Sequence, residues 1–251
     1  MQLGLTGKRA LVTGAGRGLG RSIALGLAQE GALVAVVSRT GSDLSTLVAQ
    51  MGGLSAGHYS ISCDLMSEGV PAQLLKEVLV RFGSLDIVVH NLGGTLDIQD
   101  SFCTVEEWRR VWRFNLEIAI EMNRIIIPAM QARKWGRVVH ISSIAAISGG
   151  SSIPYAAVKA ALNTYVRGLG CRVAPDGVVV SAVMPGAIRT KGGYWDTLCQ
   201  NNPEYAKKYL TEKVAIKRFG ASEEISNFVV FLCSECASFF TGAVIPIDGG
   251  T

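Results

Sequence analysis

The strongest constraint on the fold is an alternation of apolar, β-branched runs with segments of helical periodicity along almost the whole chain. The apolar runs predict strands over Lys8–Thr13, Ala32–Val37, Tyr59–Cys63, Leu85–His90, Arg137–Ser142, Val178–Met184 and Ala243–Ile247. The helical patterns cover Leu19–Gln29, Asp43–Met51, Pro71–Phe82, Val105–Ala132, Tyr155–Val173 and Glu223–Leu232. Such strands are typical of a parallel sheet covered on both faces. The pattern predicts an α/β fold, a doubly wound parallel sheet of about seven strands with helices on both faces.

Domain organisation and composition narrow the choice further. No linker divides the 251 residues, so we expect a single domain, 1–251, with an insertion at about 187–220 after the sixth strand. Hydrophobic residues make up 49%, which is enough to fill a core, and the net charge of +4 is too small for a general nucleic-acid binder. The longest uncharged stretch, 138–158, is too polar to span a membrane, and residues 1–8 show no signal-peptide pattern. We expect a cytoplasmic protein without nucleic-acid or membrane partners.

A glycine-rich turn, Thr13–Gly20, follows the first strand and opens the first helix. Leu19 stands where the common G-x-G-x-x-G motif needs its third glycine, so the pattern is T-G-x-x-x-G-x-G. Glycines let a backbone approach a pyrophosphate, and a helix amino terminus supplies free N–H groups. The turn predicts a dinucleotide site that includes Gly14, Arg17, Gly18, Leu19 and Gly20. The alternative is a tight turn that binds no ligand.

The end of the second strand indicates which dinucleotide would bind. An acidic residue near this point binds the ribose hydroxyls of NAD, but the chain has Ser38 and Arg39 there. Arg39, together with Arg17 in the glycine turn, would favour the 2′-phosphate of NADP. We therefore predict NADP rather than NAD. The alternative is that both arginines are solvated surface residues.

Three polar residues form a candidate catalytic group. Tyr155 and Lys159 are four residues apart near the start of a predicted helix, so their side chains share one face. A lysine ammonium beside a phenol lowers its pKa from about 10 and makes it a better general acid or base. Ser142 ends the fifth predicted strand, at the edge of the sheet where ligands gather. Alone, a tyrosine and a lysine at this spacing are common helix-face residues; the glycine turn and Ser142 favour catalysis.

These motifs resemble the short-chain dehydrogenase/reductase family, which has a Rossmann fold, and the resemblance spans essentially the whole chain. The chain is similar to the 3-oxoacyl-[acyl-carrier-protein] reductases of this family. Further matches lie after the third and fourth strands, in the long helix and after the sixth strand. They are Asp64 with Leu65, Asn91-Leu92-Gly93, Asn115, and Pro185-Gly186 with Ile188 and Thr190. The closing Ile247–Gly250 segment also matches the family.

The resemblance implies roles for these residues. Tyr155 would be the general acid in reduction and the base in oxidation, and Lys159 would bind the nicotinamide ribose. Ser142 would orient the substrate oxygen, and Asn115 would hold a water that relays protons to Lys159. The remaining matched residues would bind the cofactor: Asp64 and Leu65 at the adenine, Asn91 and Gly93 at the ribose, and Pro185, Gly186, Ile188 and Thr190 around the nicotinamide.

The insertion bears on the substrate. It holds seven basic and three acidic residues, with several aromatic side chains. This composition suits an anionic or acyl-bearing substrate, although a solvated helical surface is an equal alternative. Relatives that act on carrier-bound acyl groups often have a basic residue where this chain has Asp176, which weakens the carrier-protein interpretation; Arg133, Lys134 and Arg172 are nearby. The leading prediction is a 3-oxoacyl reductase; a sugar or polyketide ketoreductase and a non-catalytic NADP-binding sensor or scaffold are the alternatives.

Other features are assigned structural roles. His90 is expected to be a core residue bonded to the backbone, and Cys233-x-x-Cys236 is expected to supply small core residues on a helix. The scattered histidines and this single cysteine pair predict no metal site. By resemblance we expect a homotetramer or homodimer that packs through the helices around 104–132 and 152–174. Its candidate contacts are Val111, Leu116, Ile120, Leu162 and Leu169, for which ordinary core packing is the alternative.

Overall fold

The sheet has the predicted architecture. The computed structural model describes residues 2–150 and 152–251. Seven parallel strands lie in the order β3-β2-β1-β4-β5-β6-β7. Their bounds are β1 (Arg9–Thr13), β2 (Leu33–Ser38), β3 (Tyr59–Ser62), β4 (Ile87–His90), β5 (Gly136–Ile141), β6 (Val178–Pro185) and β7 (Val244–Ile247). The strand order reverses between β1 and β4, and a ligand crevice forms at such a point in this class of sheet.

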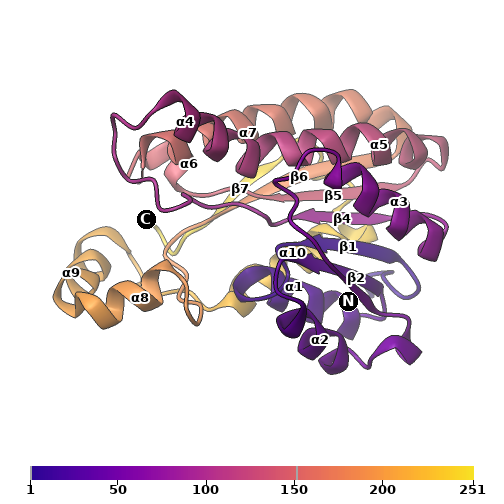
Figure 1. Cartoon of the computed structure of the whole chain (residues 1–251), viewed down its shortest axis with the longest axis horizontal. Helices are drawn as coiled ribbons and strands as arrows, with labels where there is room; N and C mark the ends of the chain where they lie inside the picture. Colours follow the sequence, from indigo (N-terminus) through magenta and orange to yellow (C-terminus); the bar gives the residue numbers. More distant parts are fainter. Residues whose placement is uncertain (1, 151) are drawn as a thin grey trace.

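Helices cover both faces of the sheet (Figure 1). They are α1 (Gly18–Gln29), α2 (Gly41–Gln50), α3 (Val70–Phe82), α4 (Val105–Trp112), α5 (Ile118–Ala132), α6 (Ala145–Ser148), α7 (Ile153–Val173), α8 (Tyr194–Asn201), α9 (Pro203–Lys213) and α10 (Ser222–Leu232). Short helical turns are η1 (Leu54–Ala56), η2 (Arg113–Glu117), η3 (Ala174–Asp176) and η4 (Glu235–Ala237). Side chains of α3, α5 and α7 fill one apolar core, and those of α1, α2 and α10 fill the other. The strands are therefore apolar on both faces, which confirms the predicted fold class.

The long helix predicted over Val105–Ala132 is interrupted. Thr104 and Glu107 form a capping box at the start of α4, and the π-helical turn η2 separates α4 from α5. Arg113 in this turn bonds the carbonyl of Met66 and the carboxylate of Glu121, each at 2.8 Å. A π-turn fits one extra residue into the helix, and here it contains the buried Asn115.

Three of the residues expected at an oligomer contact are core residues. Val111, Leu116 and Leu162 are at most 4% exposed and pack in the core shared by α3, α5 and α7. The sequence prediction is wrong for these three, because periodicity does not tell which face of a long helix meets its own sheet. Ile120 and Leu169 are only partly buried.

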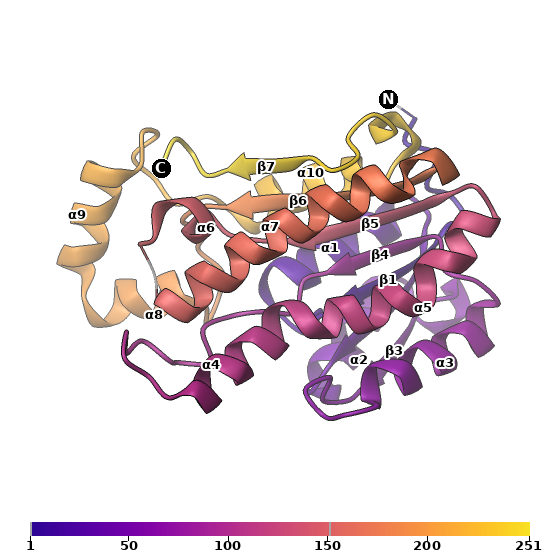
Figure 2. The same ribbon diagram turned by 90° about the horizontal axis from the view of Figure 1, so that it is seen from above.

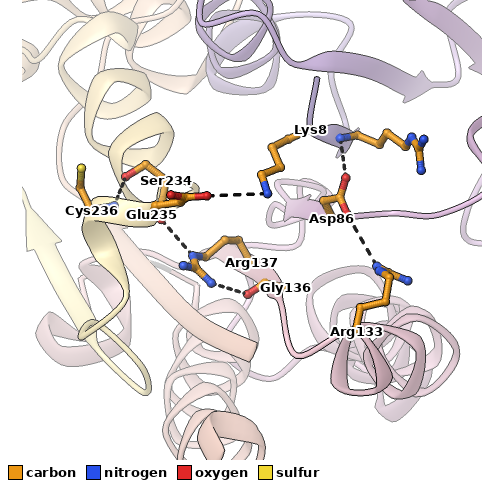
Figure 3. Close-up of polar contacts among 9 residues, drawn as sticks. Lys8, Asp86, Arg133, Gly136, Arg137, Ser234, Glu235 and Cys236 are labelled. Atoms are coloured by element: carbon orange, nitrogen blue, oxygen red, sulfur yellow. Dashed lines mark hydrogen bonds and ion pairs between the residues drawn. The ribbon is translucent and has the colours of Figure 1, made fainter. Parts of the chain in front are cut away.

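The amino-terminal edge of the sheet is held by polar contacts from distant segments (Figure 3). The Asp86 carboxylate accepts from the backbone N–H of Arg9 at 3.0 Å and pairs with Arg133 at 3.8 Å. Arg137, only 4% exposed, donates from Nε to the carbonyl of Ser234 at 2.9 Å. The contact from Arg137 fastens the end of α10 to β5, at the edge opposite the glycine turn.

The cysteine pair at this edge differs from expectation in one residue. Cys233 is fully buried at the end of α10, as expected of a core residue. Cys236 lies in η4 and is exposed, so the core prediction is wrong for it. Its backbone N–H donates to the Ser234 hydroxyl at 3.2 Å, which holds the turn after the helix.

The predicted insertion forms a projection of two helices, α8 and α9, beyond the carboxyl edge of the sheet (Figures 1 and 2). Its two ends are joined: the Arg189 N–H donates to the Gly220 carbonyl at 3.0 Å, and the Gly220 N–H donates to the Ala187 carbonyl at 2.9 Å. Trp195 packs against Tyr209 and Phe219, with ring centroids 4.4 and 5.3 Å apart. We call residues 187–220 the lid.

Two absences among the described residues bear on other classes of function. None of the helices within 2–150 and 152–251 has both the length and the apolarity that a membrane crossing requires. Over the same residues, no group of three or more histidine, cysteine or acidic side chains is placed to hold a metal ion.

Candidate active site

The glycine turn joins β1 to α1 and is closed by Asn91, which follows β4. Asn91 Nδ2 donates to the carbonyls of Thr13 at 3.1 Å and Gly14 at 3.0 Å, and the Thr13 hydroxyl accepts from the N–H groups of Asn91 and Leu92. A Cβ on Gly20 would lie 2.5 Å from Asn91 Nδ2, so only glycine fits there. Gly14, with φ of 63°, takes the left-handed conformation that glycine tolerates.

A pocket of about 630 Å³ extends from this turn along the carboxyl ends of the strands to the start of the lid. It is lined by every predicted cofactor residue except Gly20: Gly14, Arg17, Gly18, Leu19, Ser38, Arg39, Asp64, Leu65, Asn91, Gly93, Tyr155, Lys159, Pro185, Gly186, Ile188 and Thr190. Gly20 instead provides the close approach of α1 to Asn91. The structure brings these residues together, and their binding roles stay predictions.

One end of the pocket is rich in unpaired cations. Arg17 and Arg39 are exposed, and neither guanidinium has an ion pair or hydrogen bond with the described residues. Ser38 ends β2 beside the turn, and Lys191 at the start of the lid also lines the pocket. Arg17, Arg39 and Ser38 fit a phosphate at the adenosine end of a dinucleotide. Lys191 was not predicted to line the pocket, because it lies far from the glycine turn in the sequence.

Tyr155 and Lys159 lie one turn apart in α7, and both line the pocket. Lys159 Nζ is 5.6 Å from the centroid of the Tyr155 ring and donates to the Ile141 carbonyl at 2.8 Å. Burial lowers the pKa of Lys159 from 10.5 to about 7. Burial also raises the pKa of Tyr155. The sequence argument expected Lys159 to lower this pKa; in the structure burial dominates, and the effect that opposes it comes from a hydrogen bond with Ser143.

The serine that approaches the tyrosine is Ser143, not Ser142. The Ser142 hydroxyl donates to Asn163 Oδ1 at 2.6 Å and is buried. Ser143 lines the pocket and opposes the rise in the Tyr155 pKa through a side-chain hydrogen bond. Ser142 also lines the pocket, so its contact with the substrate stays a prediction, and Ser143 is a second candidate for that contact. Ser143 is adjacent to Ser142 in the sequence, so it was an available candidate. Spacing alone does not distinguish between two adjacent serines at the end of a strand.

Asn115 lies outside the pocket, in the wall that supports it. Its Nδ2 donates to the carbonyls of Val111 at 2.8 Å and Gly94 at 2.9 Å, and its Oδ1 accepts from the Gly94 N–H at 3.0 Å. A Cβ on Gly93 would lie 2.7 Å from Asn115 Oδ1 and 3.0 Å from Lys159 Nζ. The π-turn therefore places Asn115 against the loop after β4, close to the lysine.

His90 is buried, as expected, but its hydrogen-bond partner is a side chain and not the backbone: Nε2 lies 2.9 Å from Asn123 Oδ1. Burial lowers its pKa to about 4, so the ring is neutral at pH 7. His90 does not line the pocket.

The similarity to known proteins agrees with this arrangement. A family model described as "Enoyl-(Acyl carrier protein) reductase" matches residues 14–251. The chain belongs to the short-chain dehydrogenase/reductase family. It is 34% identical to the 3-oxoacyl-[acyl-carrier-protein] reductase of Aquifex aeolicus, over 100% of this chain and 99% of that protein. The prediction of an oxidoreductase of this family is confirmed.

Solved structures give the same result for the fold. L-sorbose reductase from Gluconobacter frateurii, in complex with NADPH and L-sorbose, is 31% identical and has a TM-score of 0.90, covering 100% of this chain and 98% of that one. A 3-oxoacyl (acyl-carrier-protein) reductase from Agrobacterium tumefaciens with NADP bound is 30% identical, with a TM-score of 0.90 and coverage of 99% and 96%. Both proteins were crystallised with the cofactor that Arg17 and Arg39 predict.

Proposed function

We propose that this protein is an NADP-dependent oxidoreductase that interconverts a ketone and a secondary alcohol. The observation that carries the proposal is the convergence of Tyr155, Lys159 and the glycine turn on one pocket. Two unpaired arginines at the far end of that pocket favour NADP over NAD. When bound, the cofactor supplies the hydride.

The residues of the chain supply orientation and a proton. Tyr155 donates its phenol proton to the substrate oxygen in reduction and accepts it in oxidation. Ser143, beside the phenol, orients that oxygen. Lys159 holds a positive charge next to Tyr155 and binds the nicotinamide ribose, and Asn115 supports the loop around Gly93 and holds a water for the relay to Lys159.

A 3-oxoacyl thioester is the leading substrate. The family relatives and the basic, aromatic lid support it. Docking of an acyl carrier protein is less favoured, because Asp176 forms an ion pair with Lys134 and accepts from Gln131, which neutralises a candidate basic surface. An acyl-CoA is the simpler form to test.

A sugar ketone is the second candidate, supported by the close structural match to a reductase that was crystallised with L-sorbose. NADPH oxidation with a 3-oxoacyl-CoA, the same acyl group on carrier protein, a polyketide-like ketone and ketoses separates these substrates. Stabilisation by NADPH without turnover of any of them would indicate the non-catalytic sensor or scaffold.

The variant Tyr155→Phe tests the catalytic assignment. It removes the donated proton while keeping the ring, so we expect turnover to fall at least about 1000-fold with the NADPH-dependent rise in Tm retained. Tyr59→Phe is the control, because the Tyr59 hydroxyl bonds the Val78 carbonyl away from the pocket. Turnover within tenfold of wild type in Tyr155→Phe would contradict the assignment.

Two further proposals concern the setting of the enzyme. All six cysteines are free thiols, which suits a reducing compartment such as the cytoplasm. Assembly into a homotetramer or homodimer stays a proposal from family resemblance. The molar mass of the full chain in solution, measured by light scattering, would test it.

A further inference from the structure

A cluster of buried polar side chains lies between β4, β5, α5 and α7, outside the pocket and unused by the proposed mechanism. His90 and His140 are register partners on the neighbouring strands β4 and β5. Their rings stack with centroids 4.7 Å apart. His140 is 0% and His90 5% exposed. Two histidines in this position are costly to bury unless their nitrogens are satisfied.

The hydrogen bonds of Asn123 define how the two rings are protonated. Its Oδ1 accepts from His90 Nε2 at 2.9 Å, and its Nδ2 lies 3.4 Å from His140 Nε2 and 3.1 Å from the Tyr165 hydroxyl. Because Nδ2 is a donor, His140 Nε2 is an acceptor and the proton of this neutral ring is on Nδ1. That Nδ1–H is buried and has no hydrogen-bond partner among residues 2–150 and 152–251.

A separate small cavity, of about 10 Å³, has His140 in its lining. Both histidines line it, together with Thr13, Phe114 and Asn115. Its volume is close to the minimum for one water molecule, and a buried water needs polar partners of the kind found here. An unpaired donor and a space of this size indicate a site for a single water.

The cavity adjoins the catalytic lysine through Asn115 and β5. Lys159 Nζ donates to the carbonyl of Ile141, the residue after His140. Asn115 Oδ1 and Lys159 Nζ both face the position where a Gly93 side chain would stand. Any rearrangement of the cavity wall would therefore move the support of the lysine.

The groups that face His140 keep its ring neutral. They are His90 on β4, Lys159 and Tyr165 on α7, and the uncharged Asn123 on α5. Burial lowers the pKa of His140 well below its usual value, and His90 and Lys159 lower it further. A neutral His140 adds no second positive charge next to Lys159.

We propose that His140, oriented by Asn123 and His90, donates from Nδ1 to one water in this cavity and so acts as a positioning residue for Asn115 and Lys159. This inference rests on the proposed function for its effect on turnover, but the water site itself does not. The class of ligand is a single buried water, held in the cavity that Asn115 and the two histidines line.

Two variants separate this role from simple packing. His140→Asn keeps a donor near the position of Nδ1, whereas His140→Gln keeps a polar group near Nε2 and loses the donor to the cavity. We expect His140→Asn to stay within about threefold of wild type and His140→Gln to lose about tenfold in kcat, with the KM for NADPH unchanged. A purely structural role through Asn123 predicts the opposite order.

The pH profile gives a second readout. Loss of the water lets the cavity wall at Asn115 close on Lys159, and this tighter burial disfavours the charged form of the lysine and lowers its pKa. In His140→Gln the decline of kcat on the alkaline side therefore moves to lower pH, and in His140→Asn it does not. His58→Asn is the control: His58 is buried, accepts from the Val34 N–H through Nδ1 and lines neither cavity, so kcat and its pH profile stay unchanged.

A high-resolution crystal structure of the full chain tests the site independently of activity. A water within hydrogen-bonding distance of His140 Nδ1 supports the proposal, and a cavity without it, or His140→Asn as impaired as His140→Gln, overturns it. If the wild-type protein reduces none of the ketones but the water is present, the proposed function fails while the water site stands.

Discussion

Gly93→Ala tests how closely the active site is packed around the catalytic lysine. Gly93 does not have a positive φ, so alanine causes no backbone strain and the effect comes from contacts alone. The added Cβ would lie 2.7 Å from Asn115 Oδ1 and 3.0 Å from Lys159 Nζ, against 3.4 Å for an ordinary contact. The overlaps are 3.4 − 2.7 = 0.7 Å and 3.4 − 3.0 = 0.4 Å.

Neither atom is free to move without loss. Asn115 Oδ1 accepts from the Gly94 N–H, and Lys159 Nζ donates to the Ile141 carbonyl. A displacement of this size at a catalytic group reduces kcat by about 10- to 100-fold, and overpacking costs about 1–3 kcal/mol of stability. Steady-state kinetics and denaturant unfolding measure the two effects.

The matched control is Gly168→Ala in α7, the helix that carries Lys159. No atom lies within 4 Å of its added Cβ, so the variant has unchanged kcat and equal or greater stability. If Gly93→Ala retains wild-type kcat and stability, the reasoning about Asn115 and Lys159 is refuted.

Three further predictions test other parts of the site. Arg39→Asp replaces an attraction for the 2′-phosphate by repulsion, so the KM for NADPH rises at least about tenfold while that for NADH does not rise; equal changes would refute the NADP assignment. Ser143→Ala lowers kcat about 100-fold and Ser142→Ala less than about tenfold, and the reverse order in the same assay would restore Ser142. The pKa of Lys159 is about 7 in the folded protein and 10.5 in the unfolded chain. Between pH 7 and 10.5 the unfolded chain therefore binds more protons than the folded protein. In this range the contribution of Lys159 to the free energy of unfolding rises with pH. The stability of wild type relative to Lys159→Met, from urea unfolding at pH 7 and 9, therefore increases at pH 9; no increase would contradict the lowered pKa.

The sheet could be predicted because its information is local. Strands that are buried on both faces are mostly apolar along their length, and Val34–Val37 and Val178–Val180 consist only of apolar residues. The glycine turn and the Tyr155–Lys159 spacing are likewise short-range patterns. These features place the pocket at the carboxyl edge without any knowledge of tertiary contacts.

The features that were missed depend on contacts between distant segments. The choice between Ser142 and Ser143 is made by Asn163, which takes the hydroxyl of the first. The π-turn at Asn115 keeps the helical periodicity of the residues around it, so the sequence predicts one continuous helix over Val105–Ala132. The rise in the Tyr155 pKa results from burial by the whole surrounding fold, which no spacing reveals.

The isolated β-bridge between Ile188 and Gly220 joins the two ends of the lid at its base. The chain leaves the end of β6 and comes back beside Ile188 before it enters α10, so the thirty or so intervening residues can change in length and sequence with little effect on β6. Thr190 and Lys191, near the start of the lid, belong to the wall of the pocket. Grafting the lid of a relative after Lys191 would therefore alter the cover of the pocket while it keeps these two contacts.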